Sequence, residues 1–506
     1  MLDQKTLLNN ILSKGAIIAF CLFPVFFLFA NHAGALDYQV RLDADYDLDI
    51  GDRSTDNDIY QYHSLDLYFL KNFTFQWQGG VRKDLDGETD ESVGGEDKSD
   101  VAFRGIADAA NSDKTLEYRV YSAILKYETK RFGALIGRSY LFDYEFPQFD
   151  GIMAWGHPLD WLRIEGFGGK PWHYDYIKNF SNYWGEGEFV GGAGADFLFP
   201  ESRLYFYLRY LYLRELTQRN NLIGEAEDTF VSSDHVYKLK ANYFYSDWMG
   251  TGLKTSFYNT SIRDIHVWAG GFFENILMSY YADYYMQLTG ISDLGDRVTQ
   301  FSTFLTASNP YLRFSVDLSK SFADVFNLTG PVSDILLEVT YEHRQPVNSS
   351  DESGFNPNYN MIQVGTVFAT DSKWYLNIFY ETVFTQDTIN NLHFVGGEIS
   401  KKWDKLNLGV GSSYYTNRYE TQTDVSLVED TFYAQEYYFK MKWFPLKGMD
   451  VSFKTTFERA KFKSLTDTTK INTDVVSGSA DEIITDPRNY FKFDVGVGYT
   501  FGSARK

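Results

Sequence analysis

The sequence predicts an all-β protein: a transmembrane, antiparallel, up-and-down β-barrel of about 22 strands (18–24) that follows a cleaved signal peptide. Three observations lead to this prediction. They are an export signal at the amino terminus, a hydrophobic period of two that recurs along the chain, and connections that alternate between short and long. We require an even number of strands because both ends of such a barrel are expected on the periplasmic side.

Residues 1–35 have the layout of a secretory signal peptide. Lys5 and Lys14 precede the apolar run 16–30, and the small residues Ala33-Gly34-Ala35 follow it. The run is shorter than the roughly 18 residues of a spanning helix, so an uncleaved anchor is the less favoured alternative. We therefore expect residues 36–506 to form a single exported domain. The chain's one cysteine, Cys21, leaves with the signal, so the mature domain has no disulfide or thiolate metal site.

Composition excludes two classes of protein. Aromatic residues make up 18% of the chain, which is too much apolar surface for a disordered protein. The formal net charge of −21 excludes nucleic acid as an expected partner, because a nucleic-acid binder needs a basic surface to replace counterions.

The period of two is clearest in residues 37–50. Even positions such as Tyr38, Leu42 and Leu48 are apolar, whereas the odd positions from Gln39 onward are polar or charged. A soluble strand usually has about 5–6 residues, and a tilted strand that crosses a bilayer has about 9–11. The same alternation recurs at 73–83, 204–212, 312–319, 406–411, 437–443, 449–458 and 490–501. These segments predict strands with an apolar outer face and a polar inner face.

The predicted connections alternate in length. The short ones are 71–72, 130–131, 200–202, 371–372, 404 and 445–448; the long ones are 86–115, 140–151, 170–185, 218–234, 346–359, 421–430 and 463–489. Barrels of this type place short turns in the periplasm and long loops outside. Segments 151–157 and 159–168 are predicted as strands. Segment 263–275 is predicted as an outer loop, because alternation is irregular from there through Ser279–Gln287.

A barrel of 18 or more strands is too wide for side chains to fill, so charged inward positions are candidates to line a pore. These candidates are Arg41, Asp43, Asp45, Asp47, Asp49, Arg119, Arg138, Arg163, Glu165, Arg209, Lys238, Lys240, Lys254 and Arg313. We expect the Asp43–Asp49 ladder and the basic face of Arg209, Lys238, Lys240 and Lys254 to form opposite walls, because walls of charge set pore selectivity. Plain solvated lining is the alternative for each of these charges.

A long acidic loop is predicted at 86–115. The carboxylates in and beside it are Asp84, Asp86, Glu88, Asp90, Glu91, Glu96, Asp97 and Asp100. A solvated outer loop is the favoured interpretation. The alternatives are calcium binding, bridging to lipopolysaccharide through divalent ions, or folding into the lumen as a constriction. The segment lacks the ordered pattern of a calcium-binding loop, so no metal site is predicted.

No pattern in the sequence supports catalysis. The eight histidines are scattered, and neither a zinc-binding H-E-x-x-H, a G-x-S-x-G elbow nor a phosphate-binding loop occurs. We therefore predict no enzyme activity and no cofactor. A hydrolase with Ser, His and a carboxylate converging on one face is the alternative in this class.

One stretch resembles a known family. Residues 121–169 contain, in order, a strand pattern, Ile136-Gly137-Arg138, Phe149-Asp150-Gly151 and Gly166-Phe167-Gly168-Gly169. This order resembles porin-like outer-membrane channels of the alginate-export type. The resemblance implies an arginine-rich lumen that passes an acidic polysaccharide, with Arg138, Arg163 and Arg209 in that role. The Asp43–Asp49 ladder departs from such a lumen.

These observations predict a porin-like channel in the bacterial outer membrane, for passive diffusion or export of hydrophilic solutes, with an anionic oligosaccharide as one candidate. The alternative is a barrel that sheathes a periplasmic electron-transfer or secretion partner. Expected partners are outer-membrane lipid and lipopolysaccharide, small hydrophilic solutes, and the barrel-assembly machinery, which reads a final strand ending in an aromatic residue such as Phe501. A homo-oligomer is left open, because a period of two does not show which strands offer a flat contact.

Overall fold

The structure, a computed structural model, describes residues 37–50, 55–70, 72–84, 116–144, 146–171, 189–218, 229–246, 248–290, 309–323, 332–348, 358–385, 390–422, 427–467, 480–484 and 488–502. The predicted signal peptide and the predicted acidic loop 86–115 lie outside these residues. So do the side chains of Asp49, Asp84 and Arg119.

One antiparallel sheet of 23 strands makes up the described part of the chain. The strands are β1 (Asp37–Ile50), β2 (Thr55–Leu70), β3 (Phe73–Asp84), β4 (Leu116–Glu128), β5 (Phe132–Leu141), β6 (Phe146–Leu159), β7 (Leu162–Pro171), β8 (Phe189–Phe199), β9 (Leu204–Gln218), β10 (Thr229–Ser246), β11 (Met249–Tyr258), β12 (Ser261–Phe273), β13 (Met278–Gln287), β14 (Tyr311–Ser321), β15 (Val332–Pro346), β16 (Tyr359–Thr370), β17 (Trp374–Thr385), β18 (Asn390–Lys402), β19 (Leu406–Gln422), β20 (Leu427–Trp443), β21 (Met449–Asp467), β22 (Ala480–Ile484) and β23 (Arg488–Gly502). Two 3₁₀ turns, η3 (Phe142–Tyr144) and η5 (Glu274–Ile276), complete the elements. No helix among the described residues is long and apolar enough to cross a membrane.

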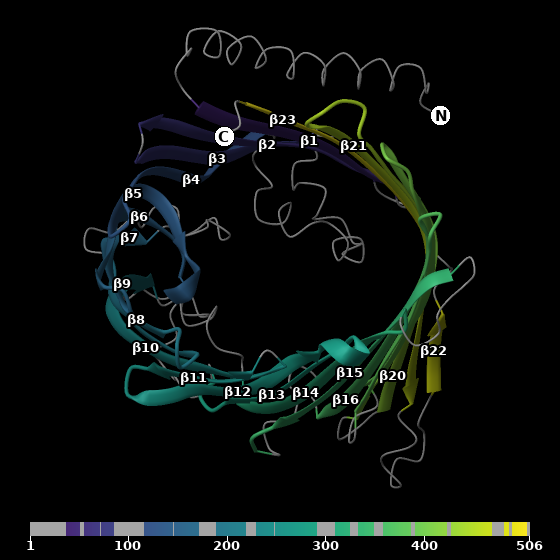
Figure 1. Cartoon of the computed structure of the whole chain (residues 1–506). Helices are drawn as coiled ribbons and strands as arrows, with labels where there is room; N and C mark the ends of the chain where they lie inside the picture. Colours follow the sequence, from purple (N-terminus) through teal and green to yellow (C-terminus); the bar gives the residue numbers. More distant parts are fainter. Residues whose placement is uncertain are drawn as a thin grey trace.

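The sheet closes on itself. β1 pairs with both β2 and β23, and β21 pairs with β23 across the chain position of β22. The short β22 extends β21 at one end instead of entering the ring. Without β22 the 23 strands leave a closed ring of 22, which Figure 1 shows from the barrel's open end. The predicted fold class and strand number are confirmed.

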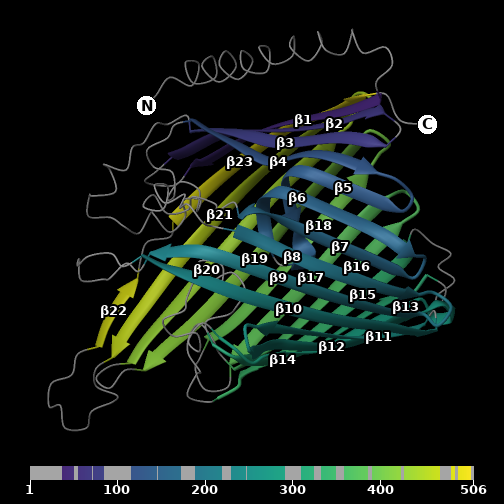
Figure 2. The same cartoon turned by 90° about the vertical axis from the view of Figure 1, so that its left-hand side faces the viewer.

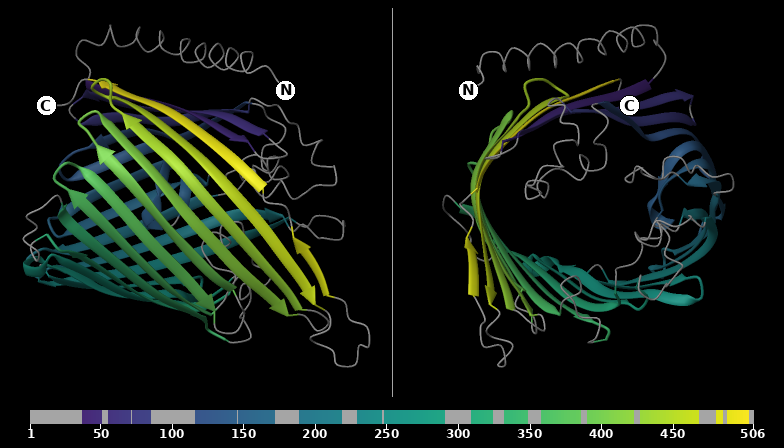
Figure 3. Two further views of the ribbon diagram at one scale, coloured as in Figure 1. Left: turned by 90° about the vertical axis from the view of Figure 1, so that its right-hand side faces the viewer. Right: turned by 180° about the vertical axis from the view of Figure 1, so that it is seen from behind.

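Both described ends of the chain lie at the same end of the barrel. Gln39 near the start of β1 is paired with Gly502 at the end of β23, as an even number of strands requires. The strands are strongly tilted, as Figure 2 and Figure 3 show. Tilt and stagger are what allow a twisted sheet to close into a barrel.

The alternation along each strand places apolar residues on the outer face of the barrel and polar residues on the inner face. Apolar residues such as Ile152 and Val410 are more than half exposed, at 55% and 59%. Outward and inward residues alternate along each strand; on β20 the exposed Tyr437 and Trp443 face outward, whereas Lys440 and Lys442 face inward. Since the outside of a closed ring is the face that meets a bilayer, the barrel has the exterior of a membrane-spanning protein.

The prediction of an outer loop at 263–275 is wrong. β12 runs over Ser261–Phe273 and pairs with both β11 and β13. A bulge between Ser256 and Phe257 shifts the register there, which hides the alternation in the sequence. The irregular segment 278–287 is a full strand as well. Tyrosine has an apolar ring and a polar tip, so it occurs on both faces of this strand and hides the alternation.

Several connections are shorter than predicted. Strands continue through most of 140–151, since β5 ends at Leu141 and β6 begins at Phe146. The predicted loop 421–430 is replaced by the extended ends of β19 and β20. Likewise β21 continues to Asp467, β22 lies within 463–489, and β10 begins at Thr229. Polar side chains in these segments mark strand ends outside the lipid and do not by themselves mark loops.

Two walls of the barrel differ in strand length. β5, β7 and β8 have 10, 10 and 11 residues, whereas β19, β20 and β21 have 17, 17 and 19. We call β5–β11 the packed wall, because almost all of the buried apolar residues lie on its inner face. We call β17–β21 the open wall, which appears in green and yellow in Figure 3.

Candidate functional site: the interior of the barrel

The connection between β5 and β6 folds into the barrel. Tyr144 of η3 is only 2% exposed, and its hydroxyl donates a 2.8 Å hydrogen bond to Glu165 Oε1 on β7. Lys238 Nζ on β10 donates to the carbonyl oxygen of Asp143 at 3.2 Å. Figure 1 shows the blue ribbon of β5 and β6 bending away from the ring toward the interior. We call η3 the tip; it adds a second layer to the packed wall.

An apolar cluster surrounds the tip. Its members are Leu141, Tyr144, Phe149, Met153, Phe167, Val190, Leu211, Leu213, Val236 and Tyr258. The Tyr144 ring meets the Phe167 ring edge-on at a centroid distance of 4.8 Å. Glycine makes room for this layer, because a Cβ added at Gly194 would overlap both the Tyr144 hydroxyl and the Arg209 side chain. The inner face of this wall is therefore filled by side chains.

Four charges of alternating sign lie beneath the tip. Arg209 on β9 contacts Glu165 through Nε–Oε1 at 3.2 Å and also binds Asp196 Oδ1. Arg163 on β7 reaches the second Glu165 oxygen at 2.9 Å. The side chains of Glu165, Asp196 and Arg209 are 3%, 8% and 8% exposed. Buried charges are tolerated only when paired and hydrogen-bonded, and here two cations balance two anions.

The sequence predicted Arg163, Glu165 and Arg209 as pore lining, and the structure brings them together. They face inward, since Arg163 is paired with Asp196 and Glu165 with Gly194 in the β7–β8 register. Glu165 and Arg209, however, are covered by the tip. Their chemistry is that of a buried anchor for η3, which spacing along the chain could not show.

A basic surface lies beside the tip. In the register, Lys238 is paired with Arg209, and Lys240 is paired with Lys254. The Lys240 ammonium lies 5.7 Å from the centroid of the Tyr207 ring. Three lysines thus face the interior on adjacent strands, as the sequence predicted for this face.

A second polar network lies on β12–β15. Asp283, 3% exposed at its side chain, accepts from Arg313 Nη2 at 3.0 Å and contacts His266 Nε2 at 3.1 Å. The Ser315 hydroxyl binds the other oxygen of Asp283. Arg313 therefore faces the interior but is tied to a carboxylate, and sequence reasoning missed Asp283 because its strand lacks a clear period.

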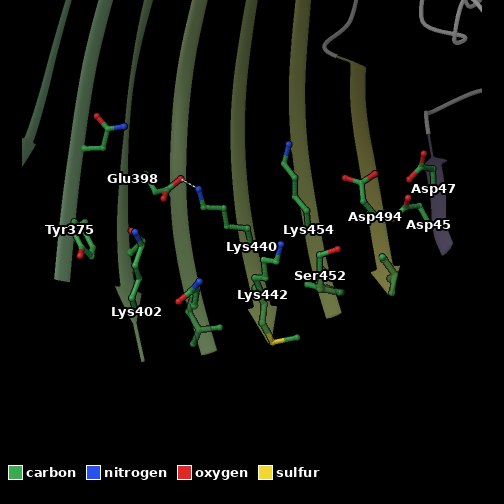
Figure 4. A pocket seen from close by; sticks show the side chains of 18 of the residues that line it. Asp45, Asp47, Tyr375, Glu398, Lys402, Lys440, Lys442, Ser452, Lys454 and Asp494 are labelled. Atoms are coloured by element: carbon green, nitrogen blue, oxygen red, sulfur yellow. Dashed lines mark ion pairs between the residues drawn. The ribbon is translucent and has the colours of Figure 1, made fainter. Parts of the chain in front are cut away.

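The acidic ladder on β1 does not form a purely acidic wall. Asp47 is paired with Asp494, Asp494 with Lys454, and Lys454 with Lys440. Arg41 Nε also binds Asp43 Oδ2 at 2.7 Å. Figure 4 shows a group of lysines beside a group of acids on this part of the inner wall, around a hollow of about 760 Å³ that Asp45 and Asp47 help to line.

Ring closure explains why the lysines were missed as neighbours of the ladder. Lys440, Lys442 and Lys454 are far from β1 in sequence, and only the β1–β23 pairing brings them beside it. Lys440 Nζ also lies 2.5 Å from Glu398 Oε2. β1 does lie across the barrel from β10 and β11, as Figure 1 shows.

Arg138 is placed differently from the prediction. Ile136 is 52% exposed on the outer face, and residues two apart in a strand share a face, so Arg138 lies on the outer face too. Asp150, its partner on β6, lies on the same face. Its guanidinium binds Asp150 at 2.7 and 2.8 Å. The prediction that Arg138 lines the pore is therefore wrong. Both faces of this strand carry small or apolar residues, so its sequence did not reveal which face turns inward.

Neither a metal centre nor the acidic loop can be assigned to this interior. Among the described residues, no group of three or more His, Cys, Asp or Glu side chains is arranged to hold a metal ion. The whole of the predicted acidic loop 86–115, along with the side chains of Asp49, Asp84 and Arg119, lies outside the described part of the chain.

Comparison with known proteins gives similarity at the level of structure alone. No protein-family model and no curated protein matches the sequence. Similar solved structures include Acinetobacter baumannii OccAB2 (9% identity, 92% of this chain and 98% of that chain, TM-score 0.42). Others are Pseudomonas aeruginosa OprD (8%, 93% and 96%, 0.36) and a BenF-like porin from Pseudomonas fluorescens (8%, 93% and 99%, 0.38). Scores this low carry no argument about function, which has to come from the barrel itself.

The architecture alone places the chain in a membrane. A closed antiparallel barrel with an apolar outside and a charged inside is how bacterial outer-membrane proteins cross the bilayer. With 22 strands in the ring, the chain is an outer-membrane β-barrel.

Proposed function

We propose that this barrel is a porin-like channel through which hydrophilic solutes diffuse passively across the outer membrane. The observation that carries the proposal is the inner face of the ring, where ionised side chains follow one another from strand to strand. A barrel of 16–18 strands already leaves an aqueous channel, and this ring has 22. Catalysis forms no part of the proposal.

The tip and the two charged surfaces determine the width of the proposed channel and the charges that a solute meets. The tip occupies space on one side, and the basic surface of Lys238, Lys240 and Lys254 lies beside it. The acidic ladder lies on the far side. Solutes are therefore expected to pass between a basic surface and a wall of mixed charge, an arrangement that selects by charge and orientation. The basic surface is the feature that favours an anionic solute.

Conductance tests the proposal directly. Refolded protein in a planar bilayer should give stable open steps, and the reversal potential in a salt gradient should report ion preference. Replacing Lys240 and Lys254 by glutamate should move the preference toward cations, because two positive charges on the inner face become negative. Lys461→Glu is the matched control, since Lys461 is paired with the outward-facing Tyr433 on β20. It should leave the reversal potential unchanged.

A silent barrel would contradict diffusion. Resistance to unfolding in detergent shows whether the protein is folded. If the folded protein shows no open steps, the channel proposal fails. The sheath for a periplasmic partner would then be the alternative to pursue, by identifying what copurifies with the barrel.

A further inference from the structure

A stripe of aromatic rings crosses the inner face of the open wall. Its members, one on each of five consecutive strands, are Phe379, Phe394, Tyr415, Phe432 and Phe462. Phe394 is paired with Tyr415, and Phe432 with Phe462. The remaining steps are diagonal neighbours, with ring centroids 4.9 Å apart for Phe379–Phe394 and 5.8 Å for Tyr415–Phe432. The stripe is therefore continuous from β17 to β21.

The stripe faces the interior. Phe379 is paired with Gly365, which itself is paired with Glu338, and Phe394 is paired with the charged Glu381. The outward rows of these strands carry other residues, such as Ile378 and Val395. All five rings are partly exposed, and Phe462 is 38% exposed.

At least one ring lies flat on the wall. A Cβ added at Gly396 would overlap the Phe379 ring, so this ring covers the glycine and turns its other face away from the sheet. Tyr438 covers Gly411 in the same way, two inward rows away from Tyr415. A ring held flat presents a rigid apolar platform at little cost in conformational entropy.

Aromatic rings at these positions need a reason, because inward positions of a water-filled barrel call only for polar side chains. Exposed apolar surface that is contiguous and bordered by polar groups marks a binding site more often than isolated apolar residues do. Here carboxylates lie along part of the border. Glu381 lies beside Phe394, and Glu436 and Glu458 are paired with each other one row away.

We propose that this stripe is a track for a neutral, hydroxyl-rich oligosaccharide. The apolar faces of successive pyranose rings would stack on the aromatic rings, and their hydroxyls would donate to Glu381 and Glu436, because carboxylate oxygens accept hydrogen bonds. An anionic sugar is disfavoured at the stripe because the neighbouring carboxylates carry the same sign of charge and repel it. The inference rests on the channel proposed above and names a solute class for one wall of it.

The competing explanation is structural. An aromatic ring over a glycine also stabilises a β-sheet by covering the exposed backbone. Trp268 offers a control for this, because it lies on β12 and covers Gly252 of β11 in the same manner without belonging to the stripe. A purely structural role predicts the same outcome for both sites.

The test is block of the open-channel current by maltohexaose, with a polyethylene glycol of equal size as the inert probe. Maltohexaose should interrupt the current at concentrations at least tenfold lower than the polymer. The double variant Phe394→Leu, Tyr415→Leu should lose this difference, whereas Phe394→Trp should keep it. In Trp268→Leu, maltohexaose should block the current at the same concentrations as in the unmodified protein.

Three results would overturn the inference. They are equal block by maltohexaose and the polymer, unchanged block in the double leucine variant, and stronger block by a hexuronate oligomer that the leucine variant abolishes. If the double variant does not fold, Phe394→Leu alone provides the comparison. An absence of any open steps would instead refute the channel, so the two proposals fail in different ways.

Discussion

The packed wall and the open wall are built by the same alternation, yet inward residues are buried on the first and exposed to the lumen on the second. On β5–β11, inward residues such as Phe149, Val190 and Leu213 are fully buried beneath the tip. On β17–β21, the inward Lys440 is half exposed and the aromatic stripe meets the lumen. The difference teaches that a period of two determines which residues face inward. What covers them depends on a three-residue turn that folds back into the ring.

Removing the central cation of the packed wall should have the largest effect. Arg209→Ala leaves Glu165 and Asp196 buried with only Arg163 nearby, and breaking a buried pair costs about 3–5 kcal/mol. The free energy of unfolding in urea, measured in lipid vesicles, should fall by that amount. The tip should also lose its anchor, so single-channel conductance should rise.

The matched variant on the open wall sharpens this comparison. Lys454→Ala removes an exposed inward cation, and exposed charges of this kind contribute about 0–1 kcal/mol. Equal losses in the two variants would show that the tip does not exclude water from the charges beneath it.

A smaller difference is expected for glycines. Gly137 on β5 has a φ of +127°, and a Cβ added there would overlap the Ala123 carbonyl, so Gly137→Ala should cost about 1–3 kcal/mol. Gly365→Ala on β16, beside the open wall, should cost almost nothing because its nearest atom would lie 3.6 Å away. Urea unfolding of both variants checks this. A tolerated alanine at Gly137 would mean that the packed wall is more adaptable than its contacts suggest.

The sequence predicted most of the ring and part of its interior. A 13-residue alternation such as that of β1 has one interpretation, because a single slip would turn its carboxylates toward lipid. Lys238, Lys240 and Lys254 were placed inward for the same reason. Local pattern is enough wherever one face is apolar and the other charged.

The rest depended on contacts between distant segments. The Tyr144–Glu165 hydrogen bond requires the tip to fold inward, and nothing in its sequence distinguishes it from an outer loop. The Lys454–Asp494–Asp47 row exists only because β23 closes on β1. The strand of Arg138 carries small residues on both faces, so its orientation follows from neighbours that alternation cannot show.

The smallest predicted effect concerns Lys440 on the open wall. Lys440→Gln removes one partner of an ion pair whose lysine is 50% exposed, so unfolding free energy should change by less than about 1 kcal/mol. The reversal potential should still shift toward cations, because Glu398 loses its neutralising partner. This shift should shrink between 0.1 M and 1 M salt, since the Debye length falls from about 10 Å to about 3 Å. A shift that persists at 1 M salt would mean that this wall is shielded from ions, and the open wall would then resemble the packed one.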